Sequence, residues 1–270
     1  MSIRMIAIDI DGTLVNSERK ITEKVKQTLM TAREKGVKIV LCTGRPFPGV
    51  EPELAELGLV TTEDYVITYN GSLVQNVGTK DTIFSAGLTN DDFLEINYMA
   101  QKLGVHLHTS STDAIYTANR DISPYTVYES FLVHMPIKYR SADEMMADPV
   151  AIIKMMMIDE PEILDAAITQ LPAEFRERYT VVKSAPFYLE ILHQGASKGV
   201  ALSHLANHLG LKADEVMAIG DNENDLTMID YAGIGVAMAN AIDEVKEAAD
   251  VTTASNDEDG VALIVEQYVL

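Results

Sequence analysis

The chain has 270 residues, of which 47% are hydrophobic, and a formal net charge of −20 from 41 acidic and 21 basic residues. This length and apolar content suffice for packed cores in two domains and exclude an intrinsically disordered chain. The negative field repels nucleic acid and anionic membranes, so we expect neither as a partner. The sequence leaves the oligomeric state open.

We expect no export signal in the first residues. A strand-like run follows Met1 directly, without a basic leader or a cleavage site, so no signal peptide is expected. The longest apolar runs, such as Ala151–Ile158, are shorter than the roughly 20 residues of a membrane span. Cys42 is the single cysteine, which excludes an intramolecular disulfide and favours a cytoplasmic location.

The first part of the chain alternates between strand and helix signals. Short β-branched runs at Arg4–Ile10 and Val37–Cys42 predict buried strands. Between them, Thr22–Lys35 has the spacing of an amphipathic helix that stops at Gly36. A third strand is predicted at Tyr65–Tyr69. Compact strand–helix–strand units of this kind predict a parallel sheet covered by helices.

The middle of the chain has a different pattern. Residues 105–108 alternate between apolar and polar, which is typical of a sheet with one solvated face, so we expect His106 and His108 on that face. Helices are predicted at Asp91–Leu103 and Glu160–Leu171. Residues 85–192 are therefore predicted to form an inserted α+β domain.

The alternating pattern resumes near the C-terminus. A helix is predicted at Lys198–Leu209, a strand at Glu215–Ile219, a short strand at Ile234–Ala237 and a closing helix at Val261–Tyr268. Residues 1–84 and 193–270 are accordingly predicted to form one discontinuous α/β domain, a parallel-sheet core interrupted by the inserted domain.

Polar residues follow three of the predicted strands. Asp9-Ile10-Asp11-Gly12-Thr13 ends the first, Thr43-Gly44-Arg45 the second, and Gly220–Asp225 a later one. The carboxyl ends of parallel strands share one edge of a sheet, where ligands bind. We therefore expect these segments to meet in one site.

Up to four carboxylates would lie at this edge: Asp9, Asp11, Asp221 and Asp225. Like charges so close together require a cation or raised pKa values. Ligands that offer only oxygen favour Mg²⁺ over zinc. Lys198 would add a second positive charge and Thr43 a hydrogen-bond donor. The sequence thus predicts a site for a hard cation and a phosphate.

The spacing of Asp9 and Asp11 suggests a division of labour. One carboxylate can attack phosphorus in line, while its neighbour gives a proton to the departing oxygen and later takes one from water. Phosphoryl transfer needs mainly positioning and charge stabilisation, which this set of residues provides.

Simpler explanations exist for the acidic motifs. Acidic residues at strand ends are common, and it is the combination of several motifs in this order that argues against chance. An EF-hand calcium loop is excluded because Leu14 or Leu226 occupies the position of its required glycine.

Other notable residues also have structural explanations. His204 and His208 lack the adjacent glutamate of a zinc motif and are expected at the surface or at the boundary of the core. Met155–Met157 and Cys42 are expected in the core. Arg45 has three open roles: positioning its loop, contacting substrate, or forming a structural ion pair.

The motifs resemble those of the haloacid dehalogenase-like hydrolases, in the Cof-type branch with an inserted type IIB cap. The resemblance spans the full length and implies a Rossmann-like core. Four family motifs are matched, at Asp9–Thr13, Thr43–Arg45, Lys198 and Gly220–Asp225. Two further segments, Tyr116–Ser130 and Lys183–Leu192, are especially similar to a bacterial sugar-phosphate phosphatase of this branch.

The resemblance implies a role for each motif residue. Asp9 would be the nucleophile and a magnesium ligand. Asp11 would be the general acid and base, and would bind magnesium through its main-chain carbonyl. Asp221 would be the third protein ligand, supported by Asp225. The phosphate would be held by Ile10 through its backbone, Thr43, Gly44, Lys198 and Asn224.

The resemblance further implies that the cap selects the leaving group. Candidates for this role are Asn119, Arg120 and Glu129, with Arg45 from the core, and a structural role stays open for each. The expected activity is Mg²⁺-dependent hydrolysis of small phosphorylated metabolites, in the first place sugar phosphates. Two alternatives stay open: a phosphotransferase or mutase, and a non-catalytic phospho-aspartate switch or sugar-phosphate sensor.

Overall fold

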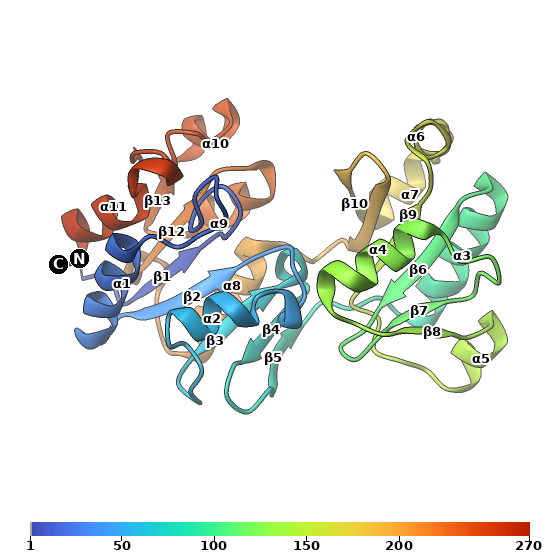
Figure 1. The fold of residues 1–270 in the computed structure, drawn as a ribbon, viewed down its shortest axis with the longest axis horizontal. Coiled ribbons are helices and arrows are strands. Elements are labelled where there is room, and N and C mark those ends of the chain that lie inside the picture. The colour runs from blue at the N-terminus through green and yellow to red at the C-terminus, as the bar shows by residue number, and fades with distance from the viewer. Residues whose placement is uncertain (1) are drawn as a thin grey trace. The chain divides into compact units, whose positions relative to one another are not determined.

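The computed structural model describes residues 2–270, which form two compact units, each with its own sheet (Figure 1). The core unit comprises the described residues up to Arg45 together with Val50–Ser85 and Ser197–Leu270. The inserted unit comprises Pro46–Gly49 and Ala86–Ala196.

The core unit is built on an eight-stranded sheet in the order β14-β13-β12-β1-β2-β3-β4-β5. Its middle strands are parallel, while β4 and β5 extend one edge in antiparallel fashion. The sequence-based prediction of a parallel sheet did not include this edge hairpin. The strands are β1 (Met5–Ile8), β2 (Lys38–Cys42), β3 (Tyr65–Thr68), β4 (Leu73–Asn76), β5 (Thr82–Ser85), β12 (Val216–Gly220), β13 (Ile234–Ala237) and β14 (Val251–Thr252).

Helices cover this sheet as its apolar strands require. The main helices are α1 (Glu23–Glu34), α2 (Glu51–Glu56), α8 (Lys198–His208), α9 (Leu226–Tyr231), α10 (Asp243–Ala248) and α11 (Gly260–Tyr268). Helices α8 and α9 share a hydrophobic core with one face of the sheet, and α1 contacts both β2 and α11. Single 3₁₀ turns are η2 (Tyr69–Gly71), η3 (Ala213–Glu215), η4 (Glu223–Asp225) and η5 (Asn256–Glu258).

Several local predictions for the core unit are confirmed. The predicted first helix forms as α1 and buries Val25, Leu29 and Ala32. Cys42 is fully buried at the end of β2. The two histidines of α8 are exposed, as expected. His204 stacks on Phe84, and His208 meets the ring of Tyr65 edge-on.

The inserted unit has a six-stranded sheet in the order β10-β11-β9-β6-β7-β8. Its strands are β6 (His106–Ser110), β7 (Ile115–Thr117), β8 (Ile137–Tyr139), β9 (Lys154–Ile158), β10 (Tyr179–Ala185) and β11 (Tyr188–His193). Its helices are η1 (Phe47–Gly49), α3 (Asn90–Leu103), α4 (Pro124–Val133), α5 (Ala142–Ala147), α6 (Pro161–Thr169) and α7 (Ala173–Arg178). Met155–Met157 lie in the core, as predicted.

The prediction that His106 and His108 lie on a solvated face is wrong for His108. Its ring is completely buried, and its Nδ1 lies 3.3 Å from the hydroxyl oxygen of Thr126 on α4. The sheet face that we expected to meet water is therefore covered by α4 at this point. His106 is half-buried, with Nδ1 2.8 Å from Oδ2 of Asp159.

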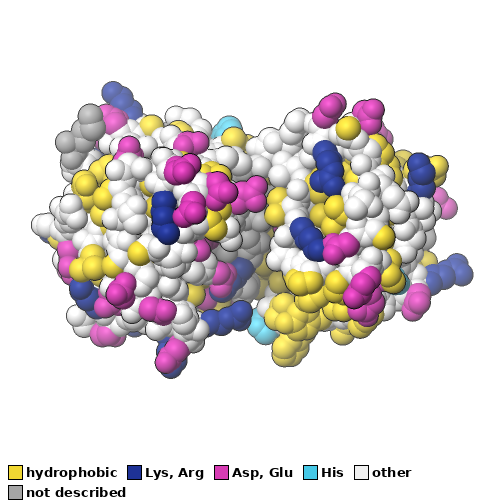
Figure 2. Space-filling model, turned by 90° about the horizontal axis from the view of Figure 1, so that it is seen from above, with side chains coloured by type: hydrophobic (Ala, Val, Ile, Leu, Met, Phe, Trp, Pro, Cys, Tyr) yellow, Lys and Arg dark blue, Asp and Glu magenta, His cyan; other side chains and the backbone are white. Residues whose placement is uncertain are grey.

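Exposed apolar side chains gather on the surface of the inserted unit (Figure 2). Four of them belong to α4: Val127, Tyr128, Phe131 and Leu132. The buried residues of α4 are Thr126, Glu129 and Val133, whereas most of its apolar residues are exposed, so the helix lacks the polar-apolar periodicity that would have identified it in the sequence. Within residues 2–270 no helix is both long enough and apolar enough to cross a membrane.

Candidate active site

Three motifs meet at the carboxyl edge of the core sheet. Asp9 follows β1, Thr43 follows β2 and Asp221 follows β12, and β1 pairs in parallel with both other strands. The backbone N–H of Asp9 donates to the carbonyl of Ile219, so pairing continues to the start of the first motif. Segments about 200 residues apart in sequence are thereby brought to one place.

Lys198 lies at the centre of this edge and has no solvent exposure. It is the first residue of α8, whose N-cap Ser197 accepts a hydrogen bond from the N–H of Val200. Its Nζ lies 2.6 Å from Oδ1 of Asp9 and 2.6 Å from Oδ1 of Asp225. Burial by itself lowers the pKa of Lys198. The two neighbouring carboxylates raise this pKa by more than burial lowers it, so the lysine is held in its charged form.

Three carboxylates surround this lysine. Asp9, Asp221 and Asp225 each offer an oxygen within 4.8 Å of the other two. Both oxygens of Asp225 are already bound, Oδ1 by Lys198 and Oδ2 by the backbone N–H groups of Asp221 and Asn222. Asp225 therefore organises the site. In this cluster, Oδ2 of Asp9 and Oδ2 of Asp221 accept no hydrogen bond from residues 2–270.

The carboxylate cluster is short of positive charge. Burial, followed by repulsion from Asp225, raises the pKa of Asp9 to about 8, although Lys198 acts in the opposite direction. Burial also raises the pKa of Asp221 to about 6, against the hydrogen bond from Thr13. A compact set of oxygen donors with raised pKa values is the donor set that a hard divalent cation fits.

Asp11 lies apart from this cluster, and its side chain is 54% exposed. Arg45 binds both of its carboxylate oxygens: Nε lies 2.8 Å from Oδ2 and Nη2 lies 2.5 Å from Oδ1. The remaining terminal nitrogen of Arg45, Nη1, lies 2.8 Å from Oε1 of Glu53 on α2. Of the three roles left open for Arg45, the structure shows an ion pair, and the ion pair involves Asp11.

The residues expected to hold a phosphate lie at the same edge. Thr43 is buried, and its hydroxyl oxygen accepts from the N–H of Arg45 at 3.1 Å. Gly44 lies against the Asn70 amide, which an added Cβ would approach to 3.0 Å. Asn224 donates to the same amide from Nδ2, at 2.9 Å. Ile10, between the two motif aspartates, is fully buried.

Three further residues of this site have contacts that the sequence did not predict. Asn70 lies in η2, shortly after β3, and accepts the hydrogen bond from Asn224 at the same edge. The hydroxyl of Thr13, at the end of the first motif, donates to Oδ1 of Asp221 at 2.9 Å. Glu53 carries no motif signal, because its role depends on Arg45 alone.

The candidate leaving-group contacts in the inserted unit have different environments. Oδ1 of Asn119 accepts a hydrogen bond from the N–H of Leu107 at 2.8 Å, which is a structural role. Glu129 is buried on α4, with an oxygen 4.0 Å from Nζ of Lys154. Arg120 is exposed.

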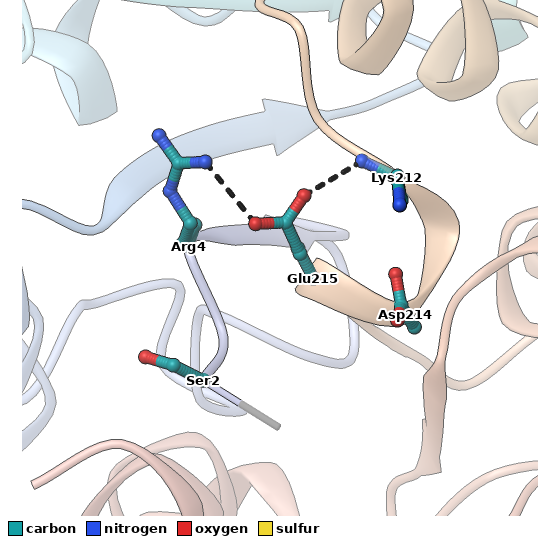
Figure 3. Close-up of a pocket in the computed structure, with 5 residues that line it drawn as sticks. All are labelled: Ser2, Arg4, Lys212, Asp214 and Glu215. Carbon is teal, nitrogen blue, oxygen red and sulfur yellow. Dashed lines mark hydrogen bonds and ion pairs between the residues drawn. The ribbon is translucent and has the colours of Figure 1, made fainter.

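A surface depression occurs at the opposite edge of the core sheet (Figure 3). Its lining comes from Ser2, Arg4, Lys212, Asp214 and Glu215, next to the amino ends of β1 and β12. Arg4 and Glu215 pair across it, with 3.1 Å between Nη1 and Oε1. It contains no motif residue, so we assign the chemistry to the carboxyl edge.

Comparison with known proteins identifies the family that the chain resembles. A family model described as haloacid dehalogenase-like hydrolase matches residues 6–265. A Bacillus subtilis protein named "Putative phosphatase YxeH" is 51% identical over 267 residues, which cover 99% of this chain and 98% of the relative.

The fold is also similar to that of solved structures of this kind. A haloacid dehalogenase-like hydrolase from Bacteroides thetaiotaomicron superposes with a TM-score of 0.83 and 35% identity, covering 98% of this chain and 99% of the other. The protein BT4131, described as a HAD subclass IIB sugar phosphatase, superposes with a TM-score of 0.78 and 26% identity, covering 98% of each chain.

Proposed function

The chain belongs to the haloacid dehalogenase-like hydrolases and is a phosphoric monoester hydrolase, and we propose that it hydrolyses sugar phosphates through an aspartyl-phosphate on Asp9. The observation that carries this proposal is the buried Lys198 between Asp9 and Asp225, with Asp221 completing the cluster. This arrangement offers a nucleophilic carboxylate, a fixed positive charge and oxygen ligands for a cation in one place.

Hydrolases of this family use a divalent metal, and we propose Mg²⁺ for this chain. Asp9, the main-chain carbonyl of Asp11 and Asp221 would hold the ion, and Asp225 would support Asp221 through its backbone N–H. Bound there, the ion would supply the positive charge that the carboxylates and a phosphate group require. The raised pKa values of Asp9 and Asp221 support the need for such a charge.

The first chemical step uses both aspartates of the first motif. A carboxylate oxygen of Asp9 attacks phosphorus, and the bond between phosphorus and the leaving oxygen breaks. Asp11 gives a proton to that oxygen, so the sugar leaves as an alcohol. Lys198 and Thr43 would contact the phosphoryl oxygens, with Ile10, Gly44 and Asn224 completing the phosphate site.

The second step returns the enzyme to its starting state. Asp11, now ionised, takes a proton from a water molecule that attacks the phosphorus of the aspartyl-phosphate. The bond between phosphorus and Asp9 breaks, and inorganic phosphate leaves. Asp11 is then protonated again for the next substrate.

The substrate class rests on two lines of support. The description of BT4131 as a sugar phosphatase concerns a protein of the same fold and length. In the inserted unit, which we propose as the cap, Arg120 is the exposed candidate for contact with a leaving group, whereas Asn119 and Glu129 have structural partners. We also propose a cytoplasmic location, to be checked by cell fractionation.

The decisive experiment is phosphate release from a panel of sugar phosphates. We expect release from several members with Mg²⁺ and none with EDTA. The variant Asp9→Asn should fold, as judged by circular dichroism, and have no turnover. Turnover by Asp9→Asn would contradict the nucleophile assignment. A phosphorylated alcohol in place of free phosphate would identify a phosphotransferase.

A further inference from the structure

Asp11 needs a partner that fixes its side chain. Its carboxylate is half exposed and does not belong to the cluster of Asp9, Asp221 and Asp225. A half-exposed aspartate has several accessible rotamers. Proton transfer to a departing oxygen, by contrast, requires the donor within hydrogen-bonding distance of one defined position.

Arg45 supplies this restraint through a two-pronged contact. Its Nε donates to Oδ2 of Asp11 and its Nη2 to Oδ1, at 2.8 and 2.5 Å. A planar guanidinium that binds both carboxylate oxygens fixes the plane of the carboxylate as well as its position. A lysine in its place would provide a point charge without this orientation.

Arg45 is itself fixed on several sides. Its N–H donates to the hydroxyl of Thr43, and its carbonyl accepts from the N–H of Tyr69, both at 3.1 Å. Its Nη1 donates to Oε1 of Glu53, whose side chain is largely buried. The other oxygen of Glu53 is buried and accepts no hydrogen bond within residues 2–270. Glu53 therefore depends on Arg45 for compensation of its charge.

We propose that Arg45, held by Glu53, is the positioning residue that orients Asp11 for proton transfer. The inference rests on the proposed function of Asp11 as general acid and base. One of the two hydrogen bonds opens when an oxygen of Asp11 carries the proton, and the other continues to hold the carboxyl group. Arg45 thus acts through Asp11 and not as a contact to the sugar.

This role has a kinetic signature that depends on the leaving group. An alkoxide from a sugar needs a proton as it leaves, whereas nitrophenolate leaves without one. Hydrolysis of the aspartyl-phosphate needs Asp11 as a base whatever group has left. A misplaced Asp11 should therefore leave the rate of nitrophenolate release nearly unchanged and slow the hydrolysis of the aspartyl-phosphate.

The test compares Arg45→Gln, Arg45→Lys and Glu53→Gln with the unchanged protein in stopped-flow experiments with p-nitrophenyl phosphate. For Arg45→Gln we expect a burst of nitrophenolate at a rate within about 3-fold of the unchanged protein. Steady-state turnover after the burst should fall roughly 100-fold, as should kcat/KM for glucose 6-phosphate. Arg45→Lys and Glu53→Gln should show the same pattern with smaller losses.

Two controls separate positioning from other effects. Arg33→Lys alters another arginine–aspartate pair of the core unit and should leave all rates unchanged. In this pair, Nη2 of Arg33 on α1 binds both oxygens of Asp64, which precedes β3. In the Asp11→Asn background, Arg45→Gln should cause no further loss, because a residue that acts only through Asp11 has nothing left to position.

Three results would overturn the inference. Equal losses in burst and steady state would indicate a structural role. Losses that disappear at saturating substrate would indicate a substrate contact. A further loss in the Asp11→Asn background would show that Arg45 acts independently. If the unchanged protein releases no phosphate or nitrophenolate, the proposed function fails, and the inference fails with it.

Discussion

Lys198 is a buried cation whose two partners are both carboxylates. Its Nζ contacts Asp9 and Asp225, and the lysine is completely buried. A buried ion pair adds little net stability compared with apolar residues, because both charges lose their hydration. Removing one partner alone is costly, since the other charge is left uncompensated and buried away from water. At this residue, stability and the proposed phosphate binding thus depend on the same charge.

We predict that Lys198→Met destabilises the core unit by about 3–5 kcal/mol, because Asp9 and Asp225 are left without their common partner. Urea unfolding followed by circular dichroism at pH 7.5, with EDTA present, measures this change. Lys20→Met is the matched control, since Lys20 pairs with Glu18 on the exposed surface. Equal effects of the two substitutions would contradict the proposed electrostatic role of Lys198.

His108 makes the inserted unit sensitive to acid. Burial, with a smaller contribution from Lys154, lowers the pKa of His108 from an ordinary 6.5 to about 3. Between pH 3 and pH 6.5, His108 therefore binds a proton in the unfolded chain but not in the folded chain. Stability is fully present above about pH 6.5 and is lost as the pH falls toward 3.

We predict that the free energy of unfolding of the inserted unit falls by about 1.4 kcal/mol per pH unit below pH 6 through His108. His108→Gln should lose this part of the pH dependence, so the difference between variant and unchanged protein should shrink on going from pH 7 to pH 5. Urea unfolding at several pH values measures it. A constant difference would contradict the assignment, and the exposed His208→Gln serves as control.

Residue types and their order predicted the acidic and basic groups of the site, but their partners required the structure. Asp9 and Asp221 stand out because they follow the apolar runs of β1 and β12, and Lys198 because it begins a predicted helix. Nothing in the sequence connects Arg45 to Asp11 or to Glu53, because such contacts depend on side-chain directions in the folded chain. His108 was misplaced for a related reason, since alternation along a strand does not reveal which helix covers it.

At the scale of elements, the turn after β3 brings the backbone of η2 against the start of α8. Gly71 has a φ of +90°, and an added Cβ would lie 2.1 Å from the carbonyl oxygen of Ser197. The next residue, Lys198, carries the central positive charge. The absence of a side chain at Gly71 therefore permits the close approach that positions Lys198.

We predict that Gly71→Ala lowers turnover roughly 100-fold, because the clash displaces the N-terminus of α8 and with it Lys198. Gly36→Ala is a matched control: Gly36 has a φ of +89° and nothing within 4 Å of an added Cβ. Both variants should lose about 1–2 kcal/mol of stability from the strained backbone. Phosphate release and urea unfolding measure both effects, and equal turnover of the two variants would contradict the prediction.

Elements differ in how far the sequence predicted them. Helix α1 was predicted because Val25, Leu29 and Ala32 repeat at helical spacing and a glycine follows its end. Strands β4 and β5 were missed because the chain between β3 and the inserted unit offers only short runs beside turn residues. Helix α4 was missed because its buried side carries Thr126 and Glu129 while most of its apolar residues are exposed.

The whole molecule carries a net charge of −20, to which the carboxylate cluster adds a strong local concentration. A general salt effect acts on the net charge and screens it within a Debye length of about 10 Å at 0.1 M. A bound divalent cation acts on the cluster only and stabilises the folded state in proportion to its affinity. The two effects can therefore be separated by comparing salts at equal ionic strength.

We predict that MgCl₂ at about 100 times its dissociation constant stabilises the core unit by about 2.7 kcal/mol more than NaCl of equal ionic strength. Asp221→Asn should lose most of this increment, because it removes the negative charge and one carboxylate oxygen. The oxygen available to a metal is Oδ2, which accepts no hydrogen bond from residues 2–270. In EDTA at pH 7.5 the same variant should be at least as stable as the unchanged protein, since burial and Asp225 raise the pKa of Asp221 to about 6 and its ionised form is destabilised there. Thermal unfolding followed by circular dichroism measures both. An equal increase in stability from the two salts would contradict a metal site at this cluster. So would an Asp221→Asn variant that is less stable than the unchanged protein in EDTA but responds equally to Mg²⁺.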